Sequence, residues 1–250
     1  MPRLHEIWPS NNRYYCGCCI AGPANQWPGL ACIHCCSILI LVPFCVFVAK
    51  ENFSTVPVLP ILFFISVVAM FVLLYLTACI DPGIIPRRAF LESNPEQHAR
   101  FLSLDNPRQC TTCFIGRPLK AGHCRECNNC VEVFDHHCGV IGTCIAKRNY
   151  RYFISFLGTV MLSIVLLVVN MIFFVISKTQ SSISQTAVIV IASVLGGILG
   201  VPLLSFFGIH LYLAITRKTT RDVLKKIKHD PNEPVENQWC DVDPPVLDLF

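Results

Sequence analysis

A stretch of forty residues, 110–149, is so rich in metal-binding side chains that it constrains the fold more than any other feature of the chain. Seven cysteines and three histidines lie within it. Two cysteines separated by two residues, such as Cys110 and Cys113, have the close spacing that lets two side chains from one turn reach a tetrahedral zinc ion. The ten candidate ligands are Cys110, Cys113, His123, Cys124, Cys127, Cys130, His136, His137, Cys138 and Cys144.

These side chains outnumber what two structural zinc sites require. A closed site uses four ligands, so two sites leave one cysteine and one histidine over. A spare cysteine beside a spare histidine suggests a nucleophile with its base. His136 and His137 are consecutive, so their side chains diverge, and one could bind metal while the other faces a reaction. Asp135, immediately before them, could orient the free imidazole.

The order and spacing of these residues resemble the DHHC cysteine-rich domain of membrane protein S-acyltransferases, or palmitoyltransferases. The resemblance rests on Asp135-His136-His137-Cys138 and on all ten ligand-type positions. It implies Cys138 as the nucleophile, His136 as its base and Asp135 as the orienting carboxylate. It also implies two structural Zn²⁺ ions, one held by Cys110, Cys113, His123 and Cys130, the other by Cys124, Cys127, His137 and Cys144.

Two further residues fit this family pattern outside the ligand series. Asn149 stands at the family's asparagine position. Thr219-Thr220-Arg221-Asp222 resembles a Thr-Thr-x-Glu element in which a threonine braces the active-site carboxylate, so by analogy Thr220 contacts Asp135. The same four residues also read as the start of a capped amphipathic helix on an anionic membrane surface, and both interpretations stay open.

Hydropathy predicts a membrane protein. The chain is 53% hydrophobic and only 14% charged, with a mean hydropathy of +0.54. Each of its four apolar runs is long enough to cross the hydrocarbon core as a helix, and we expect Lys50 and Glu51 to end the first. The expected fold is an α-helical integral membrane protein with four transmembrane helices and a cytosolic zinc-binding cysteine-rich domain between helices 2 and 3. The runs span residues 30–49, 56–80, 153–176 and 186–215.

The chain divides into five parts on this basis. The cysteine-rich part has too few aliphatic residues to fold around a core of its own, so metal must supply its stability. The expected parts are a cytosolic N-terminal segment (1–29), transmembrane helices 1 and 2 (30–80), a cytosolic linker with the zinc domain (81–152), transmembrane helices 3 and 4 (153–215), and a cytosolic amphipathic helix with a tail (216–250).

The N-terminal segment has the composition of an irregular juxtamembrane stretch without a signal peptide. Its cysteines, Cys16, Cys18 and Cys19, are either sites of S-acylation of the protein itself or ordinary reduced thiols. Sixteen cysteines in a chain of this kind indicate reduced, metal-bound thiols on a cytosolic face rather than disulfides.

The resemblance implies a two-step acyl transfer. Palmitoyl-CoA or another long-chain acyl-CoA would acylate Cys138, and the acyl group would then pass to a cysteine of a membrane-associated protein that faces the cytosol. The lipid bilayer and an accessory subunit are the other expected partners, and no nucleic acid is expected. By the same resemblance the Golgi or endoplasmic reticulum membrane is the expected location.

Three alternatives compete with this interpretation. A RING-type ubiquitin ligase closes its ligand series with a second Cys-x2-Cys, whereas the last interval here is Cys138-x5-Cys144. A transporter would place more polar groups inside the spans. The third alternative is a non-catalytic DHHC-type membrane binding or scaffold protein. It is suggested by Gly139 and Val140, which stand where the family has Pro-Trp; we expect a slower but real enzyme.

The distribution of basic residues predicts the orientation in the membrane. Eighteen of the twenty Lys and Arg residues fall in the N-terminal segment, in residues 81–152 and in the tail, and only Lys50 and Lys178 lie in the other loops. Positive charge concentrates on the cytosolic side. Both termini and the zinc domain are therefore expected to be cytosolic.

This orientation can be measured with glycosylation tags. A tag inserted at residue 53 or 181 is expected to be glycosylated in cells, because both positions lie in the charge-poor loops. A tag at residue 90 should stay unmodified and serves as the control. Glycosylation at residue 90 instead would contradict the predicted topology.

Overall fold

The computed structural model describes residues 10–15, 19–88, 108–177 and 183–226, with only part of the side chains between 183 and 199. The predicted acylation sites Cys16 and Cys18 and the predicted tail beyond residue 226 lie outside these residues. The chain forms two compact units. The cysteine-rich unit comprises Met1–Gly29, Leu76–Phe153 and Tyr212–Phe250, and the helical unit comprises Leu30–Tyr75 and Ile154–Leu211.

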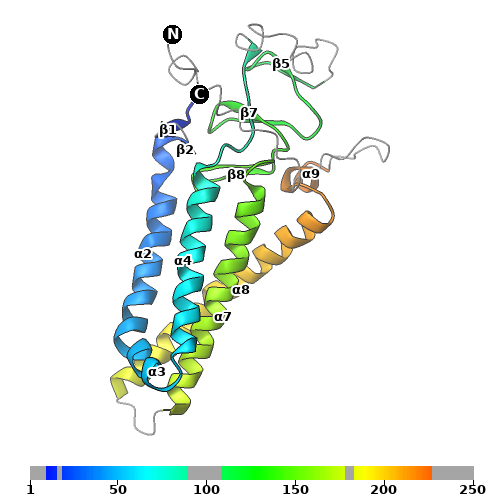
Figure 1. Cartoon of the computed structure of the whole chain (residues 1–250). Coiled ribbons are helices and arrows are strands. Elements are labelled where there is room, and N and C mark those ends of the chain that lie inside the picture. The colour runs from blue at the N-terminus through cyan, green and yellow to red at the C-terminus, as the bar shows by residue number, and fades with distance from the viewer. Residues whose placement is uncertain (1–9, 16–18, 89–107, 178–182, 227–250) are drawn as a thin grey trace. The chain divides into compact units, whose positions relative to one another are not determined.

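Long apolar helices dominate the chain, as the hydropathy predicted. They are α2 (Trp27–Pro43), α4 (Val58–Cys79), α7 (Tyr150–Ser177) and α8 (Ile183–Ile215) (Figure 1). Within the described residues, three stretches are long and apolar enough to cross a membrane: Ala24–Thr55, Val58–Cys79 and Tyr150–Ser177. The protein is therefore a helical multi-pass membrane protein, and a fourth span over α8 stays a prediction.

The first helical stretch is longer than expected. After α2 the chain continues through a π-helical stretch, η2 (Phe44–Ala49), into α3 (Lys50–Thr55). The expectation that Lys50 and Glu51 end the helix was wrong. The hydroxyl groups of Ser54 and Thr55 donate hydrogen bonds back to the carbonyl of Glu51, and the helix ends at Thr55.

Aromatic packing and a few buried polar contacts hold the helical unit together. Asn52 is fully buried and donates to both the carbonyl oxygen and the Oδ1 of Asn170, at 3.0 Å each, while Asn170 donates to the carbonyl of Leu59 at 3.1 Å. Ser66 and Ser163 share a hydrogen bond of 2.9 Å. The buried apolar cluster consists of Phe44, Val48, Ala49, Phe63 and Phe174.

The cysteine-rich unit is built from short antiparallel strands. β1–β2, β4–β5 and β8–β9 are two-stranded, and the remaining strands form a sheet in the order β3-β7-β6. Two short helical segments complete the described elements, η1 (Ala24–Gln26) and α9 (Thr220–Leu224). The strands are β1 (Arg13–Tyr15), β2 (Cys19–Ala21), β3 (Ile84–Ile85), β4 (Gln109–Cys110), β5 (Ile115–Gly116), β6 (Gly122–Cys124), β7 (Asn129–Val131), β8 (His136–Cys138) and β9 (Thr143–Ile145).

Cysteine side chains take up much of the interior of this unit. One buried cluster consists of Ile85, Cys110, Cys113, Ile115, Ala121 and Cys130. The other consists of Ile20, Ile84, Cys124, Cys127, Val131, Cys144 and Ala146. Few aliphatic groups are available beside the sulfur atoms, so hydrophobic burial alone provides little stability.

The pair Asn52 and Asn170 provides a test of the helical unit. Asn170→Leu removes the side-chain hydrogen bonds to Asn52, Leu59 and Leu166. We expect it to lower the free energy of unfolding by about 1 kcal/mol, the scale of such bonds in membranes. Thermal unfolding in mild detergent measures this. Ser205→Ala is the matched control, because the exposed Ser205 hydroxyl donates to the carbonyl of Val201 in its own helix. Equal melting temperatures for the two variants would contradict the assigned role.

Candidate active site and metal centres

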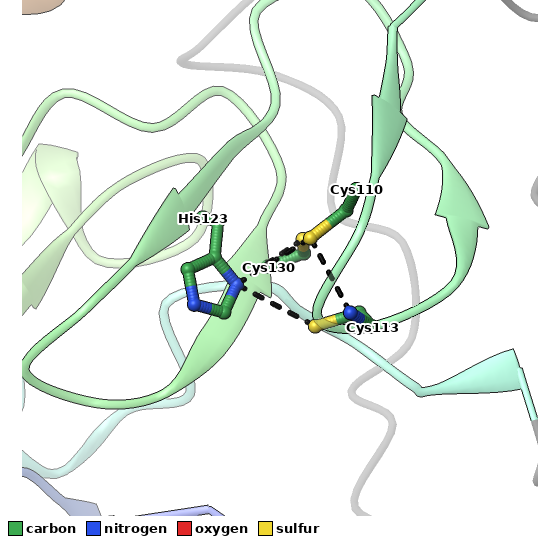
Figure 2. A group of neighbouring side chains, drawn as sticks. All are labelled: Cys110, Cys113, His123 and Cys130. Atoms are coloured by element: carbon green, nitrogen blue, oxygen red, sulfur yellow. Dashed lines mark hydrogen bonds between the residues drawn. The ribbon is translucent and has the colours of Figure 1, made fainter.

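The first group of metal-ligating side chains joins a turn to a pair of strands. Cys110 and Cys113 lie at the turn between β4 and β5, and the backbone N–H of Cys113 donates to the Cys110 sulfur at 3.4 Å. His123 on β6 faces Cys130 on β7 across the sheet. Figure 2 shows the three sulfur atoms gathered around Nδ1 of His123, at 3.6 Å for Cys110, 3.5 Å for Cys113 and 3.8 Å for Cys130.

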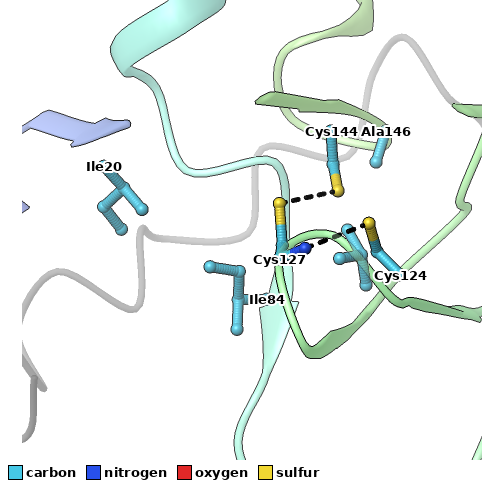
Figure 3. Packing of buried hydrophobic residues seen from close by; sticks show 7 residues of the cluster. Ile20, Ile84, Cys124, Cys127, Cys144 and Ala146 are labelled. Carbon is cyan, nitrogen blue, oxygen red and sulfur yellow. Dashed lines mark hydrogen bonds between the residues drawn. The ribbon is translucent and has the colours of Figure 1, made fainter. Parts of the chain in front are cut away.

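The second group repeats this design further along the chain. Cys124 and Cys127 form the turn, again with an N–H to sulfur bond of 3.4 Å, and His137 on β8 faces Cys144 on β9. Nδ1 of His137 lies 3.5 Å from the sulfurs of Cys124 and Cys127 and 3.7 Å from that of Cys144. Figure 3 shows these sulfurs beside Ile84 and Ala146.

Both groups have the dimensions of a zinc site. With Zn–S near ~2.3 Å and Zn–N near ~2.05 Å, a tetrahedral ion separates a sulfur from a nitrogen ligand by roughly 3.6 Å. The six sulfur–nitrogen distances range from 3.5 to 3.8 Å. Each group also offers four potential ligand atoms within 4.8 Å of one another. The two Cys3His groups therefore fit two zinc ions with the ligand sets that the sequence pattern implied.

The acid–base properties of the sulfur atoms favour such a cation. The pKa of Cys113 falls to about 5, chiefly through its hydrogen bond with Cys130, while the same contact raises the pKa of Cys130. In the second group a hydrogen bond with Cys127 lowers the pKa of Cys124, and that contact raises the pKa of Cys127 to about 12. Neighbouring thiolates thus oppose each other's ionisation, and a divalent cation among them removes this repulsion.

The strand β8 separates metal-binding from reactive side chains. Successive residues of a strand point to opposite faces, so His137 turns to the second metal centre while His136 and Cys138 share the other face. His136 hydrogen bonds to Cys138, and its Nδ1 lies 2.7 Å from Oδ2 of Asp135. The structure thus brings together the three residues that the resemblance assigned to catalysis.

Asp135 is almost completely buried and is held from a distant part of the sequence. Thr220, at the start of α9, donates its backbone N–H to Oδ1 and its hydroxyl to Oδ2 of Asp135, both at 2.8 Å. The neighbouring Thr219 caps α9 in a capping box with Asp222. Thr220 thus makes the contact with Asp135 that the family analogy implied, and Thr219 makes the helix cap of the other interpretation. The helix ends at Leu224, so the predicted amphipathic helix is shorter than expected.

Asn149 connects three segments directly before α7. Its side-chain amide donates to the carbonyls of Thr77 and Cys144, and its Oδ1 accepts from the backbone N–H of Ala146. The bond to Cys144 ties the helix start to a ligand of the second centre. Asn149 is fully buried, and these three hydrogen bonds explain how a polar side chain is accommodated at this position.

Electrostatics favour a charged pair at Cys138. Burial lowers the pKa of His136, but hydrogen bonds to Asp135 and Cys138 outweigh it and raise that pKa to about 9. Burial raises the pKa of Cys138, but bonds with His136 and with the backbone N–H groups of Ile141 and Val140 bring it below its usual value. The pKa of Asp135 is also lowered, because bonds from His136 and Thr220 exceed the effect of burial. A thiolate beside an imidazolium is a reactive nucleophile.

Sequence reasoning missed several contacts that support the site. The N-terminal segment, expected to be irregular, forms the β1–β2 hairpin, and Asn12 accepts a hydrogen bond of 2.7 Å from Asn129. Arg148, counted only as a basic residue at the membrane, forms an ion pair with the buried Asp81. No local pattern signals these pairs, because each joins residues more than sixty positions apart.

Comparisons with known proteins agree with this architecture. An integral membrane chain with two Cys3His centres beside a Cys-His-Asp group belongs to the class of membrane proteins with zinc-binding cysteine-rich domains. Residues 103–227 match the family model of the DHHC palmitoyltransferases. The chain is 31% identical to protein S-acyltransferase 8 of Arabidopsis thaliana, an alignment that covers 95% of this chain and 67% of the relative.

Animal relatives show similar levels of identity. Palmitoyltransferase ZDHHC18 of Mus musculus is 32% identical over 62% of this chain and 46% of its own length. Palmitoyltransferase ZDHHC9 of Danio rerio is 32% identical over 72% of this chain and 53% of its own length. The chain thus spans about half to two thirds of the length of these relatives. It belongs to the DHHC palmitoyltransferase family, which confirms the resemblance seen in the sequence.

The metal content follows from the two centres. Purified protein should carry two zinc ions per chain, because each centre offers four ligands at the required distances. Cys113→Ser should lower the content to about one, since only the first centre loses a ligand. Cys79→Ser, which changes a cysteine outside both groups, is the control. Elemental analysis in mild detergent gives the stoichiometry, and one zinc in the unmodified protein would contradict the ligand assignment.

Proposed function

We propose that the protein is a protein S-palmitoyltransferase that moves a long-chain acyl group from acyl-CoA to cysteines of membrane-associated proteins. The observation that carries the proposal is the hydrogen-bonded series from Cys138 through His136 and Asp135 to Thr220. The names of the relatives, protein S-acyltransferase and palmitoyltransferase, support the same chemistry.

The first half-reaction acylates the enzyme. His136 accepts the proton of the Cys138 thiol, and the resulting thiolate attacks the carbonyl carbon of the acyl-CoA thioester. The bond to the CoA sulfur breaks, and CoA leaves as a thiol with the proton from His136. Asp135 keeps the imidazole oriented and stabilises its positive charge while Thr220 keeps Asp135 in place.

The second half-reaction returns the enzyme to its starting state. His136 accepts the proton of a substrate cysteine, whose sulfur attacks the thioester carbon on Cys138. The bond to the Cys138 sulfur breaks, the sulfur recovers the proton from His136, and the acylated substrate leaves. Zinc bound by the two Cys3His groups would fix the fold around β8 and takes no part in these bond changes.

The membrane arrangement that suits this function follows from the charge distribution. We place residues 1–29, 81–152 and 216–250 on the cytosolic side, with transmembrane residues 30–80 and 153–215 between them. Cysteines of cytosol-facing proteins are then accessible to Cys138, and the charged CoA stays in water. We propose the Golgi or endoplasmic reticulum membrane as the location and an accessory subunit as a further partner.

A non-catalytic binding role is the second candidate, and the loop after the nucleophile favours it. Gly139 replaces a proline that would fix φ, and Val140, 56% exposed, replaces a larger tryptophan. A membrane protein of this type would bind partners through a zinc-stabilised domain without forming an acyl-enzyme. The retained Asp135, His136 and Cys138 favour the enzyme, because a disused site loses the nucleophile as readily as its neighbours.

Formation of the acyl-enzyme distinguishes the two candidates. The unmodified protein should incorporate label from radioactive palmitoyl-CoA in a form released by hydroxylamine, because a thioester on Cys138 is cleaved by that reagent. Cys138→Ser should abolish the label while the zinc content stays at two, since Cys138 belongs to neither metal group. Cys79→Ser should retain the label. Folded, zinc-loaded protein without label at any chain length would establish the binding role.

A further inference from the structure

The loop Gly139–Gly142, which directly follows Cys138, packs against an N-terminal segment more than a hundred residues away in the sequence. This segment, Gly22–Gly29, follows β2 and includes the start of α2. The segment and the loop belong to the same cysteine-rich unit. The loop is also where the chain departs from the family pattern, so the contact lies at the position that lacks a proline.

Two glycines of the segment allow the backbones to approach closely. A Cβ added at Gly22 would lie 1.6 Å from the carbonyl oxygen of Gly142. A Cβ added at Gly29 would lie 2.4 Å from the carbonyl oxygen of Val140 and 2.5 Å from that of Gly139. Both obstacles are backbone atoms, which cannot rotate away. Gly29 also lies in α2, where alanine is otherwise the better residue, so the contact explains the glycine.

Gln26 fills the space between these two contacts. A Cβ added at Gly139 would meet Oε1 of Gln26 at 3.4 Å, and one at Gly142 would meet its carbonyl oxygen at 3.2 Å. Gly142 has a φ of +83°, which favours glycine. The segment thus lies close to the loop at Gly139, Val140 and Gly142, while Gly139 and Val140 stay exposed on another side.

The hairpin before the segment is attached to the second metal centre. The backbone N–H of Asn11 donates to the carbonyl of Cys127 at 3.0 Å, and its side chain donates to the carbonyl of Glu126 at 2.8 Å. Asn12 bonds to Asn129, and Ile20, 1% exposed, lies in the apolar cluster around the centre (Figure 3). The segment therefore starts from a fixed point.

The loop is in turn hydrogen-bonded to the backbone of the nucleophile. The N–H of Gly142, at the end of the loop, donates to the Cys138 carbonyl at 2.7 Å. A displacement of the loop therefore moves Cys138 itself. Reaction rates are sensitive to such errors, and about 1 Å of misplacement costs roughly a hundredfold.

We propose that Gly22–Gly29 is a positioning element that holds the Gly139–Gly142 loop and thereby aims the Cys138 sulfur. A proline after the cysteine would restrict the backbone of the loop through its fixed φ, and here packing against Gly22–Gly29 restricts it instead. The segment contacts the loop backbone and not the reacting atoms, so its residues are positioning residues. The expected effect on the rate of acyl transfer rests on the proposed function. The expected effect on the position of Cys138 does not.

The test replaces the close-approach glycines. Gly22→Ala and Gly29→Ala should each slow acyl-enzyme formation at saturating palmitoyl-CoA by roughly tenfold or more. The half-saturating concentration should stay unchanged, as should two zinc ions per chain. Gly208→Ala is the matched control, because a Cβ at this helical glycine meets nothing within 4 Å. Adding Gly139→Pro to Gly22→Ala should restore part of the rate, which a purely structural defect would not allow.

A second readout separates this proposal from the proposed function. N-ethylmaleimide should alkylate Cys138 at a rate several-fold different in Gly22→Ala from that in the unmodified protein, without acyl-CoA present, because the displaced loop no longer holds the Cys138 backbone in place through the Gly142 N–H. Wild-type rates in both measurements would overturn the proposal. If the unmodified protein forms no acyl-enzyme, the proposed function fails, and the alkylation rate alone then tests whether Gly22–Gly29 positions Cys138. If an alanine variant loses zinc, Gln26→Ala decides by the same two rates.

Discussion

The rest of the cysteine-rich unit depends on the pairing of a histidine with a cysteine across two antiparallel strands. His123 faces Cys130, and His137 faces Cys144. Each pair lies beside a Cys-x2-Cys turn, so one metal ion would connect that turn to a pair of antiparallel strands. Because the sulfur atoms of each group oppose one another's ionisation, a cation among them stabilises their thiolate forms. Metal binding therefore takes the place of the aliphatic core that the unit lacks.

The strand pair β8–β9 also positions the residues that we assign to catalysis. β8 carries His137 on one face and His136 with Cys138 on the other, so the second metal centre fixes the register that aims the nucleophile. A shift by one residue would exchange these faces. Asp135 lies directly before the strand and is held by Thr220 from the far end of the chain. The site thus combines one local constraint, strand alternation, with one distant contact.

Local regularities of the sequence predicted much of this organisation. Apolar runs indicated the helices, and the number of ligands indicated two metal sites. The family resemblance implied the same two groups of four that the structure brings together. The predictions failed where tertiary contacts decide. Lys50 and Glu51 lie within a helical stretch whose next residue, Asn52, is bonded to the distant Asn170. The polar N-terminal residues form a hairpin, and the partners of Asn11 and Asn12 beside it, Glu126, Cys127 and Asn129, also lie far away in the sequence. Neither contact leaves a periodic or spacing signal.

The glycine after Cys138 shows how such distant contacts change the meaning of a motif. Read locally, Gly139 loosens the nucleophile, since glycine samples more conformations than proline and loses more entropy when it is fixed. In the folded unit, however, the conformations open to this loop are limited by the backbone of Gly22–Gly29 rather than by residue 139. The order of a loop is set by all the atoms around it. A departure from a motif therefore predicts disorder only when the surrounding contacts are also missing, and here they are present.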